Sequence, residues 1–151
     1  MKRLLIATVL GSLTACNIQN VDIAQPVAVA DKFYGALKSG DSQTALTQFA
    51  PEFRSHVNEW PNLLSGLDEH AGRVTTAELQ GGSLAANKEG PCYLLTYLVK
   101  RGQNASNELL FICSKRGASE WFIHGHRLTR TDTKQSISGG ILPTEVGTQT
   151  P

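Results

Sequence analysis

The chain has 151 residues, with 14 Lys and Arg against 13 Asp and Glu, so its formal net charge is +1 at pH 7. Binding to nucleic acid requires a basic surplus or a basic stripe, and we expect no nucleic-acid partner because neither is present. The length is sufficient for one domain with a hydrophobic core and too short for two.

The N-terminus has the pattern of an export signal. Residues 2–3 are basic, and the apolar run at residues 4–10 is too short to cross a bilayer, which needs about 20 apolar residues. The segment Leu13-Thr14-Ala15-Cys16 resembles the lipobox of bacterial lipoproteins. This resemblance implies that the chain is cut before Cys16, that the thiol receives a diacylglyceryl group and that the new amine is often acylated as well. An ordinary signal peptide with a chance cysteine, or a buried N-terminal helix, is the alternative.

The residue after Cys16 bears on the location. In Gram-negative lipoproteins, Asp at this position favours retention in the inner membrane, and this chain has Asn17. By this resemblance we expect a bacterial envelope protein that is anchored by lipid, faces the periplasm and lies in the outer membrane rather than the inner membrane. Removal of residues 1–15 would leave 12 basic and 13 acidic residues, because Lys2 and Arg3 are lost.

Two cysteines remain once Cys16 is lipidated. Cys92 and Cys113 form an even pair in an oxidising compartment, and structural disulfides persist there. We therefore expect them to pair. Two buried free thiols are the alternative, whereas a redox pair is disfavoured because the Cys-x-x-Cys spacing is missing.

The part of the chain that follows the anchor begins with a linker and a helix. Residues 16–26 are polar and lack a helical or strand period, which is typical of a linker. Residues 27–39 have apolar side chains at i, i+3, i+4 and i+7, which predicts an amphipathic helix that ends at Gly40. The apolar positions are Ala30, Phe33, Tyr34 and Leu37.

Two or three shorter helices are expected next. Asp41 has the character of an N-cap, and the helix after it should end at Pro51. A further helical pattern extends to Pro61, and residues 61–71 either continue it with a kink or restart it. The apolar positions are Ala45, Leu46 and Phe49 in the first pattern and Phe53, Val57 and Trp60 in the second.

From residue 74 the pattern predicts strands and an antiparallel meander. The expected strands are residues 74–79, 83–87 (after a bulge or turn at Gly81 and Gly82), 92–101, 107–115 and 121–130, with turns at residues 102–106 and 116–119. If Cys92 lies opposite Cys113, residues 102 and 103 form a two-residue hairpin turn, although other loop lengths also fit. Residues 131–151 are polar and are expected to be disordered.

Helices followed by antiparallel strands predict an α+β domain, with the helices packed on one face of a curved sheet. The chain resembles the nuclear transport factor 2-like superfamily, a cone-shaped fold shared with ketosteroid isomerase, over residues 27–130. The phrases that carry this resemblance are Phe33-Tyr34 with Leu37, Ser39-Gly40-Asp41, Ala45-Leu46, Phe49 with Pro51-Glu52-Phe53, and Glu120-Trp121 with Ile123, Gly125, His126, Arg127 and Leu128. The superfamily contains enzymes and also exported domains without catalytic residues, so the fold alone does not choose a function.

His124 and His126 are the sharpest candidate for chemistry. On a regular strand, residues i and i+2 project to the same face, so both imidazoles would point into the cone or away from it, together with Phe122 and Leu128. Two such histidines could supply a general base. Zinc requires three or four ligands, and His56 and His70 have no matching ligand spacing, so we expect no metal site and no cofactor.

An enzyme of this superfamily would place an acid or a base in the pocket. The candidate residues are Tyr34, Tyr93, Tyr97, Asp68, Glu69 and His124, and no spacing links them as a catalytic pair. The tyrosines at helix and strand periods are more typical of amphipathic core residues, and Asp68 and Glu69 are typical of a solvated face. The sequence therefore favours no catalytic residue.

The leading functional hypothesis is a non-enzymatic module, tethered to the membrane, that binds an envelope or secreted protein. It would act as an accessory or assembly factor of an envelope complex, or as an immunity-type inhibitor, and it could form a homodimer. The alternative is a small apolar ligand held in the cone, and an enzyme that uses His124 or His126 is the third hypothesis. The expected pocket residues are Phe33, Tyr34, Trp60, Phe111, Trp121, His124 and His126.

Overall fold

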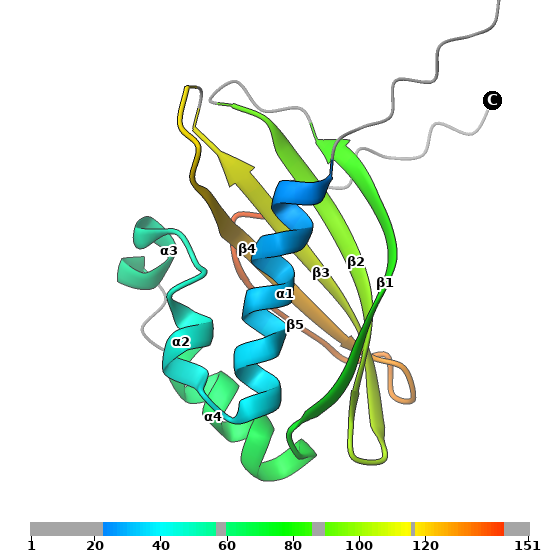
Figure 1. Ribbon diagram of the computed structural model, residues 1–151. Helices are drawn as coiled ribbons and strands as arrows, with labels where there is room; N and C mark the ends of the chain where they lie inside the picture. Colours follow the sequence, from blue (N-terminus) through cyan, green and yellow to red (C-terminus); the bar gives the residue numbers. More distant parts are fainter. Residues whose placement is uncertain (1–22, 57–59, 86–89, 116, 144–151) are drawn as a thin grey trace, which may run out of the picture.

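The computed structural model describes residues 23–56, 60–85, 90–115 and 117–143. Within these ranges the helices are α1 (Ala24–Ser39), α2 (Ser42–Leu46), α3 (Pro51–His56) and α4 (Trp60–Ala71). The strands are β1 (Val74–Ala85), β2 (Cys92–Arg101), β3 (Asn104–Ser114), β4 (Trp121–Arg130) and β5 (Ser136–Gly140). They form one antiparallel sheet in chain order, and α1 lies across one face of it (Figure 1). The predicted α+β class is confirmed.

The predicted signal peptide and Cys16 lie outside the described residues, as does the end of the chain from residue 144. No described helix is both long enough and apolar enough to span a membrane. The lipid anchor therefore stays a prediction.

The first helix begins earlier than the sequence pattern indicates. α1 starts at Ala24, so residues 24–26 belong to the helix and not to a linker. Pro26 is buried in the first turn, where a proline is tolerated because its missing N–H would have no partner within the helix. The other end is as predicted: Gly40 has a left-handed φ of 76°, and its N–H donates to the carbonyl of Leu37 (3.1 Å).

The short helices also follow their predicted signals. The carboxylate of Asp41 accepts a hydrogen bond from the backbone N–H of Thr44 (2.9 Å), which caps α2. α4 begins at Trp60, so Pro61 stands in its first turn, where a proline is tolerated. Val57 lies between the two helices, outside the described residues.

The register of the β2–β3 hairpin is the one that places Cys92 opposite Cys113. The pairing continues to Arg101 opposite Asn104, which leaves Gly102 and Gln103 as a two-residue turn. Gly102 has a φ of 55°, a backbone conformation that favours glycine. β3 therefore begins three residues before the predicted start, and β1 has the predicted irregularity, between Leu79 and Gly81.

The expectation of disorder from residue 131 is wrong for the described part of this segment. Residues 136–140 form β5, which pairs with β4 from Thr129 opposite Ser136 to Gly125 opposite Gly140. β5 passes over aromatic rings: a Cβ at Gly139 would overlap Trp60, and one at Gly140 would overlap Phe53. Gly139 and Gly140 lie in the segment that was expected to be a disordered polar tail, and their lack of a side chain allows the backbone of β5 to lie against these rings.

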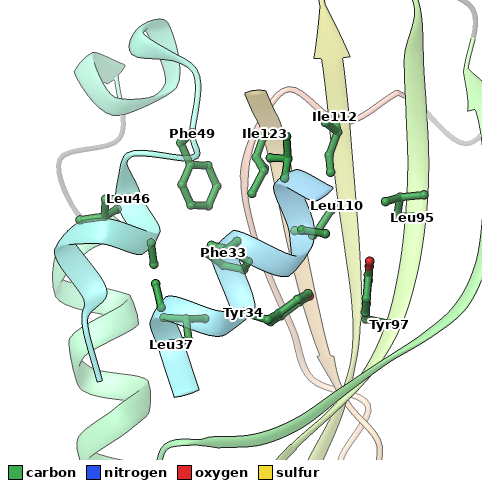
Figure 2. Packing of buried hydrophobic residues seen from close by; sticks show 14 of the residues in the cluster. Phe33, Tyr34, Leu37, Leu46, Phe49, Leu95, Tyr97, Leu110, Ile112 and Ile123 are labelled. Atoms are coloured by element: carbon green, nitrogen blue, oxygen red, sulfur yellow. The ribbon is translucent and has the colours of Figure 1, made fainter. Parts of the chain in front are cut away.

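The hydrophobic core lies between the sheet and the helices (Figure 2). Phe33 and Leu37 of α1 point toward it, and Phe49 follows α2. The rings of Phe33 and Phe49 meet edge to face, at a centroid distance of 5.4 Å. The strands contribute side chains that are fully buried: Leu95, Val99, Leu110, Ile112 and Ile123.

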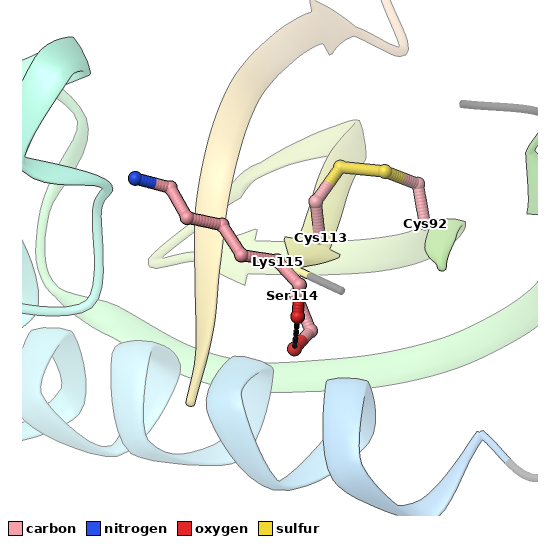
Figure 3. The surroundings of a disulfide bond; sticks show 4 residues. All are labelled: Cys92, Cys113, Ser114 and Lys115. Carbon is pink, nitrogen blue, oxygen red and sulfur yellow. Dashed lines mark hydrogen bonds between the residues drawn. A yellow bond between two sulfur atoms is a disulfide. The ribbon is translucent and has the colours of Figure 1, made fainter. Parts of the chain in front are cut away.

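The disulfide lies in a second, smaller cluster. Cys92 and Cys113 are joined, with an S–S distance of 2.09 Å, at the ends of β2 and β3 (Figure 3). Phe111 is the third buried member of this cluster, which is separate from the main core. The bond therefore joins β2 to β3 at one end of the sheet.

Replacing both Cys92 and Cys113 with Ser should lower the free energy of unfolding by about 3 kcal/mol, because the disulfide restricts the conformations of the unfolded chain and so lowers its entropy. The bond spans a sequence separation of 21 residues. Chemical denaturation of the wild type and the double variant measures the loss. Alkylation of the native protein should leave both cysteines unmodified by intact mass, and a doubly alkylated native protein would contradict the disulfide.

Candidate functional site

The central polar residue of the interior is Glu108 on β3, whose side chain is fully buried. Its Oε1 accepts hydrogen bonds from Arg101 Nη1 (2.5 Å) and Ser106 Oγ (3.0 Å). Its Oε2 accepts from Tyr34 Oη (3.1 Å) and contacts His126 Nε2 (2.9 Å). Each of the four partners is at most 5% exposed. We call these five residues the Glu108 cluster; it joins α1 to β2, β3 and β4.

The strand pattern places this carboxylate inside. Side chains on β3 alternate between the two faces, so Ser106 and Glu108 lie on the same face as the core residues Leu110 and Ile112. Glu108 is opposite Tyr97 of β2, which is also buried. The interior position of Glu108 is thus a consequence of the register.

The environment keeps Glu108 ionised. Burial alone raises the pKa of its carboxyl, because the charged form loses its hydration. The hydrogen bond and electrostatic attraction from His126, together with those from Arg101, outweigh burial and lower the pKa from 4.5 to about 2. At neutral pH, Glu108 is therefore a fixed negative charge and is poorly suited to exchange protons with a substrate.

The partners of Glu108 keep their donor roles. Burial, followed by the charge of Glu108, raises the pKa of Tyr34 well above 10.0, so its hydroxyl stays protonated. An ionised carboxylate can only accept hydrogen bonds, so His126 must donate from Nε2. Both contacts are thus charge-assisted hydrogen bonds, the stronger kind.

The expectation that His124 and His126 project to the same face is wrong. Ile112 pairs with Ile123 and Phe111 pairs with Gly125, so the β3–β4 register skips His124. This bulge reverses the alternation of faces: Ile123 and His126 are both fully buried, whereas His124 is half-buried and borders a surface hollow.

A distant segment contacts the bulge. The backbone N–H of Ile123 donates to the carbonyl of Gln48, and its carbonyl accepts from the N–H of Ala50, both at 2.9 Å. These bonds extend β4 with a short bridge to the residues between α2 and α3. We infer that this pairing accounts for the bulge.

Four of the seven predicted pocket residues do come together, and they form core rather than an open pocket. Phe33 and Trp60 each meet the ring of His126 edge to face, at centroid distances of 5.5 Å. Tyr34 contacts Phe33 at 4.9 Å and is nearly fully buried, as are the other three residues. The Nδ1 atom of His126 and the Nε1 atom of Trp60 are buried and have no hydrogen-bond partner among the described residues.

The other three predicted pocket residues lie elsewhere. Phe111 packs with the disulfide, in a different cluster from His126. Trp121 contacts Tyr93 (5.7 Å) near the start of β4, and His124 is excluded from the interior by the bulge. The predicted set therefore does not form one site.

None of the remaining catalytic candidates forms a described hydrogen bond to Glu108. Tyr97 lies close to Tyr34, with ring centroids 4.9 Å apart, but its buried hydroxyl has no described hydrogen-bond partner. Burial, with a smaller effect of Asp31, raises the pKa of Tyr97 to about 12. Asp68 is half-buried and Glu69 is exposed on α4, as expected for a helix face near solvent.

Glu108 and Arg101 are the functional candidates that the sequence patterns missed. The signal for both was present in the hairpin register. Once Cys92 lies opposite Cys113, Glu108 falls opposite Tyr97 and shares a face with Leu110. A carboxylate at this position requires a cation nearby, because an unpaired buried charge is costly. Arg101, at the end of β2, meets that requirement.

A hollow of about 350 Å³ opens beside the Glu108 cluster, bordered by α4 and by the ends of β2, β3 and β4. Arg101 and Ser106 belong both to the cluster and to the lining of this hollow. A smaller hollow of about 210 Å³ lies at the other end of β4 and is bordered by His124, Glu52 and Lys115. Among the described residues, no group of three His, Cys, Asp or Glu could hold a metal ion.

Comparison with protein-family models, with curated proteins and with solved structures gives no match to this chain. The resemblance to nuclear transport factor 2-like proteins therefore depends on the sequence phrases and the order of elements alone.

Two tyrosine variants separate a hydrogen bond in the Glu108 cluster from packing. Tyr34→Phe should lower the free energy of unfolding by about 2 kcal/mol, because it removes a donor to a buried carboxylate. Tyr97→Phe is the matched control and should change stability by less than about 0.5 kcal/mol, or increase it, because this hydroxyl has no described partner. Denaturation curves measure both. Equal losses in the two variants would show that the hydrogen bond contributes nothing specific.

The pKa of Glu108 also predicts the acid response. The folded-state pKa of about 2 lies below the ordinary 4.5, so the stabilisation is present above pH 4.5 and is lost as pH falls toward 2. The loss should be on the order of 3 kcal/mol. Glu108→Gln should be less stable than the wild type at pH 7, because the buried charge of Arg101 loses its counter-charge. The difference in free energy of unfolding between the two proteins should become smaller as the pH falls toward 2. A difference in free energy of unfolding that does not change with pH would contradict the low pKa of Glu108.

Proposed function

We propose that this chain is a lipid-tethered envelope module of the nuclear transport factor 2-like kind that binds another protein by adding a partner strand to the edge of β1. The tether is the one predicted at Cys16. The partner would be an envelope or secreted protein, and the module would serve it as an accessory factor or as an immunity-type inhibitor. The observation that carries the proposal is the exposed apolar edge of the sheet.

β1 is the outermost strand of the sheet and is 12 residues long. Leu79 and Leu84 on this strand are 40% and 59% exposed. At an edge, one row of backbone N–H and carbonyl groups is open to pairing with another chain. A long edge strand with exposed leucines is therefore suited to β-strand addition by a partner.

The edge has few of the features that usually prevent pairing. β1 contains one charged residue, Glu78, and no lysine or proline. Its bulge near Leu79 interrupts the strand, but residues Gly81–Ala85 pair with β2 in a continuous register. A partner strand could therefore align with this segment and place an apolar side chain against Leu84. β5, at the opposite edge, is only five residues long.

The Glu108 cluster fits a binding module better than an enzyme. Its carboxylate is ionised and enclosed, and its bonds join α1 to the three central strands. A cluster of this kind stabilises the shape of the sheet on which β1 is presented. We therefore assign a structural role, and not a catalytic one, to the residues of the Glu108 cluster.

Leu84→Lys tests the proposal, because a charge on the exposed edge opposes strand addition. Full-length protein is captured from detergent-solubilised envelopes, and partner recovery is compared with that of Ile141→Lys. Ile141 is 69% exposed and follows β5 at the opposite edge, so it controls for charge and lost apolar area. We expect a near-stoichiometric partner with the wild type and Ile141→Lys, and at least a tenfold lower recovery with Leu84→Lys.

Hydrogen exchange then locates the contact. Partner binding should slow exchange of β1 amides at residues 81–85. Equal recovery with Leu84→Lys, or recovery of the bait alone, would refute the edge proposal. If the only species recovered is a second copy of this chain, the partner is not another protein.

A further inference from the structure

The hollow beside the Glu108 cluster has a largely apolar wall. Five of its lining residues are Leu67, Ala71, Ala105, Leu128 and Ile137. Ile137 is 41% exposed. The volume of about 350 Å³ is at the lower end of the range for small-molecule pockets.

The charged groups of this lining are all basic. His70, Arg101 and Arg130 border the hollow, and no acidic residue is among its described lining residues. His70 and Arg130 lie near solvent, whereas Arg101 is only 4% exposed. The hollow therefore combines an apolar wall with one buried cation.

Arg101 uses only one side of its guanidinium within the Glu108 cluster. Both of its hydrogen bonds to described residues, to Glu108 and Ser106, leave from Nη1. Its Nε is buried and has no described partner. The Nε–Nη2 side of a guanidinium can hold a carboxylate with two parallel hydrogen bonds.

Arg130 shows the same side of a guanidinium filled by a carboxylate. Its Nε and Nη2 donate to the two oxygens of Asp132, at 3.0 Å and 2.7 Å. Arg101 has no such second carboxylate among the described residues. A buried donor without a partner costs free energy, so an acceptor that reaches Nε of Arg101 would recover that cost.

We propose that this hollow binds a small carboxylic acid with a compact apolar body. Its carboxylate pairs with the Nε–Nη2 side of Arg101, and its body contacts Leu67, Leu128 and Ile137. A planar acceptor with two oxygens matches the two parallel donors. The carboxylate of Glu108 bonds Nη1 of Arg101 and not the Nε atom, and it also accepts a hydrogen bond from His126. The site is independent of the β1 edge, so either proposal can fail alone.

The test uses four carboxylates (butanoate, octanoate, benzoate and phenylacetate) and the matched alcohol 1-octanol. Binding to the purified protein is measured by calorimetry, and the ¹⁵N resonance of Arg101 Nε is followed during titration. Leu67→Trp places a larger side chain in the lining of the hollow and changes no residue of the Glu108 cluster. Leu84→Trp is the control, since it introduces the same side chain at an exposed position on β1.

We expect saturable binding of at least one carboxylate, with a shift of the Arg101 Nε resonance. Leu67→Trp should weaken this binding at least tenfold, and Leu84→Trp should leave it unchanged. If octanoate is the acid that binds, 1-octanol should bind at least tenfold more weakly. The proposal is overturned if no carboxylate binds saturably, if Leu67→Trp binds as well as the wild type, or if the Arg101 resonance does not move.

Discussion

The structure depends on one buried charge, the carboxylate of Glu108. The free-energy cost of removing this carboxylate from water is offset by Arg101 and His126. The hydroxyl groups of Tyr34 and Ser106 donate further hydrogen bonds to it. A buried carboxylate is tolerated only when its oxygens are well hydrogen-bonded and its charge is balanced, and both conditions are met here. Because the donors come from α1, β2, β3 and β4, these elements must meet in one arrangement for the charge to be tolerated.

This requirement links stability to the two functional proposals. The cluster joins α1 to β2, β3 and β4, and β1 is paired with β2 at the outside of this sheet, where our first proposal places the partner. The same cluster holds Arg101 at the wall of the apolar hollow and uses only one side of its guanidinium. The charge pair of Glu108 and Arg101 thus joins the central strands and leaves the buried Nε of Arg101 without a described partner.

Features that depend on neighbouring residues were predictable from the sequence. Gly40 and Asp41 mark the junction of α1 and α2, and the pairing of Cys92 with Cys113 indicated the hairpin register. Features set by distant contacts were not predictable. The bulge at His124 occurs where Ile123 bonds to Gln48 and Ala50, and the glycines of β5 are required by aromatic rings of α3 and α4. No pattern within a single strand reports such contacts.

The same distinction explains the candidate site. Phe33 and Tyr34 were predictable as inward residues, because helical periodicity identifies a face. The inward position of Glu108 is not evident from the pattern of its own strand, because it depends on the pairing with Tyr97 of β2. The most direct measurement is the pH titration of the Glu108 side-chain carboxyl carbon by NMR in the folded protein. The account predicts that this carboxyl stays ionised down to pH values near 2. Titration at or above its ordinary pKa of 4.5 would contradict the claim that a balanced buried charge organises the fold.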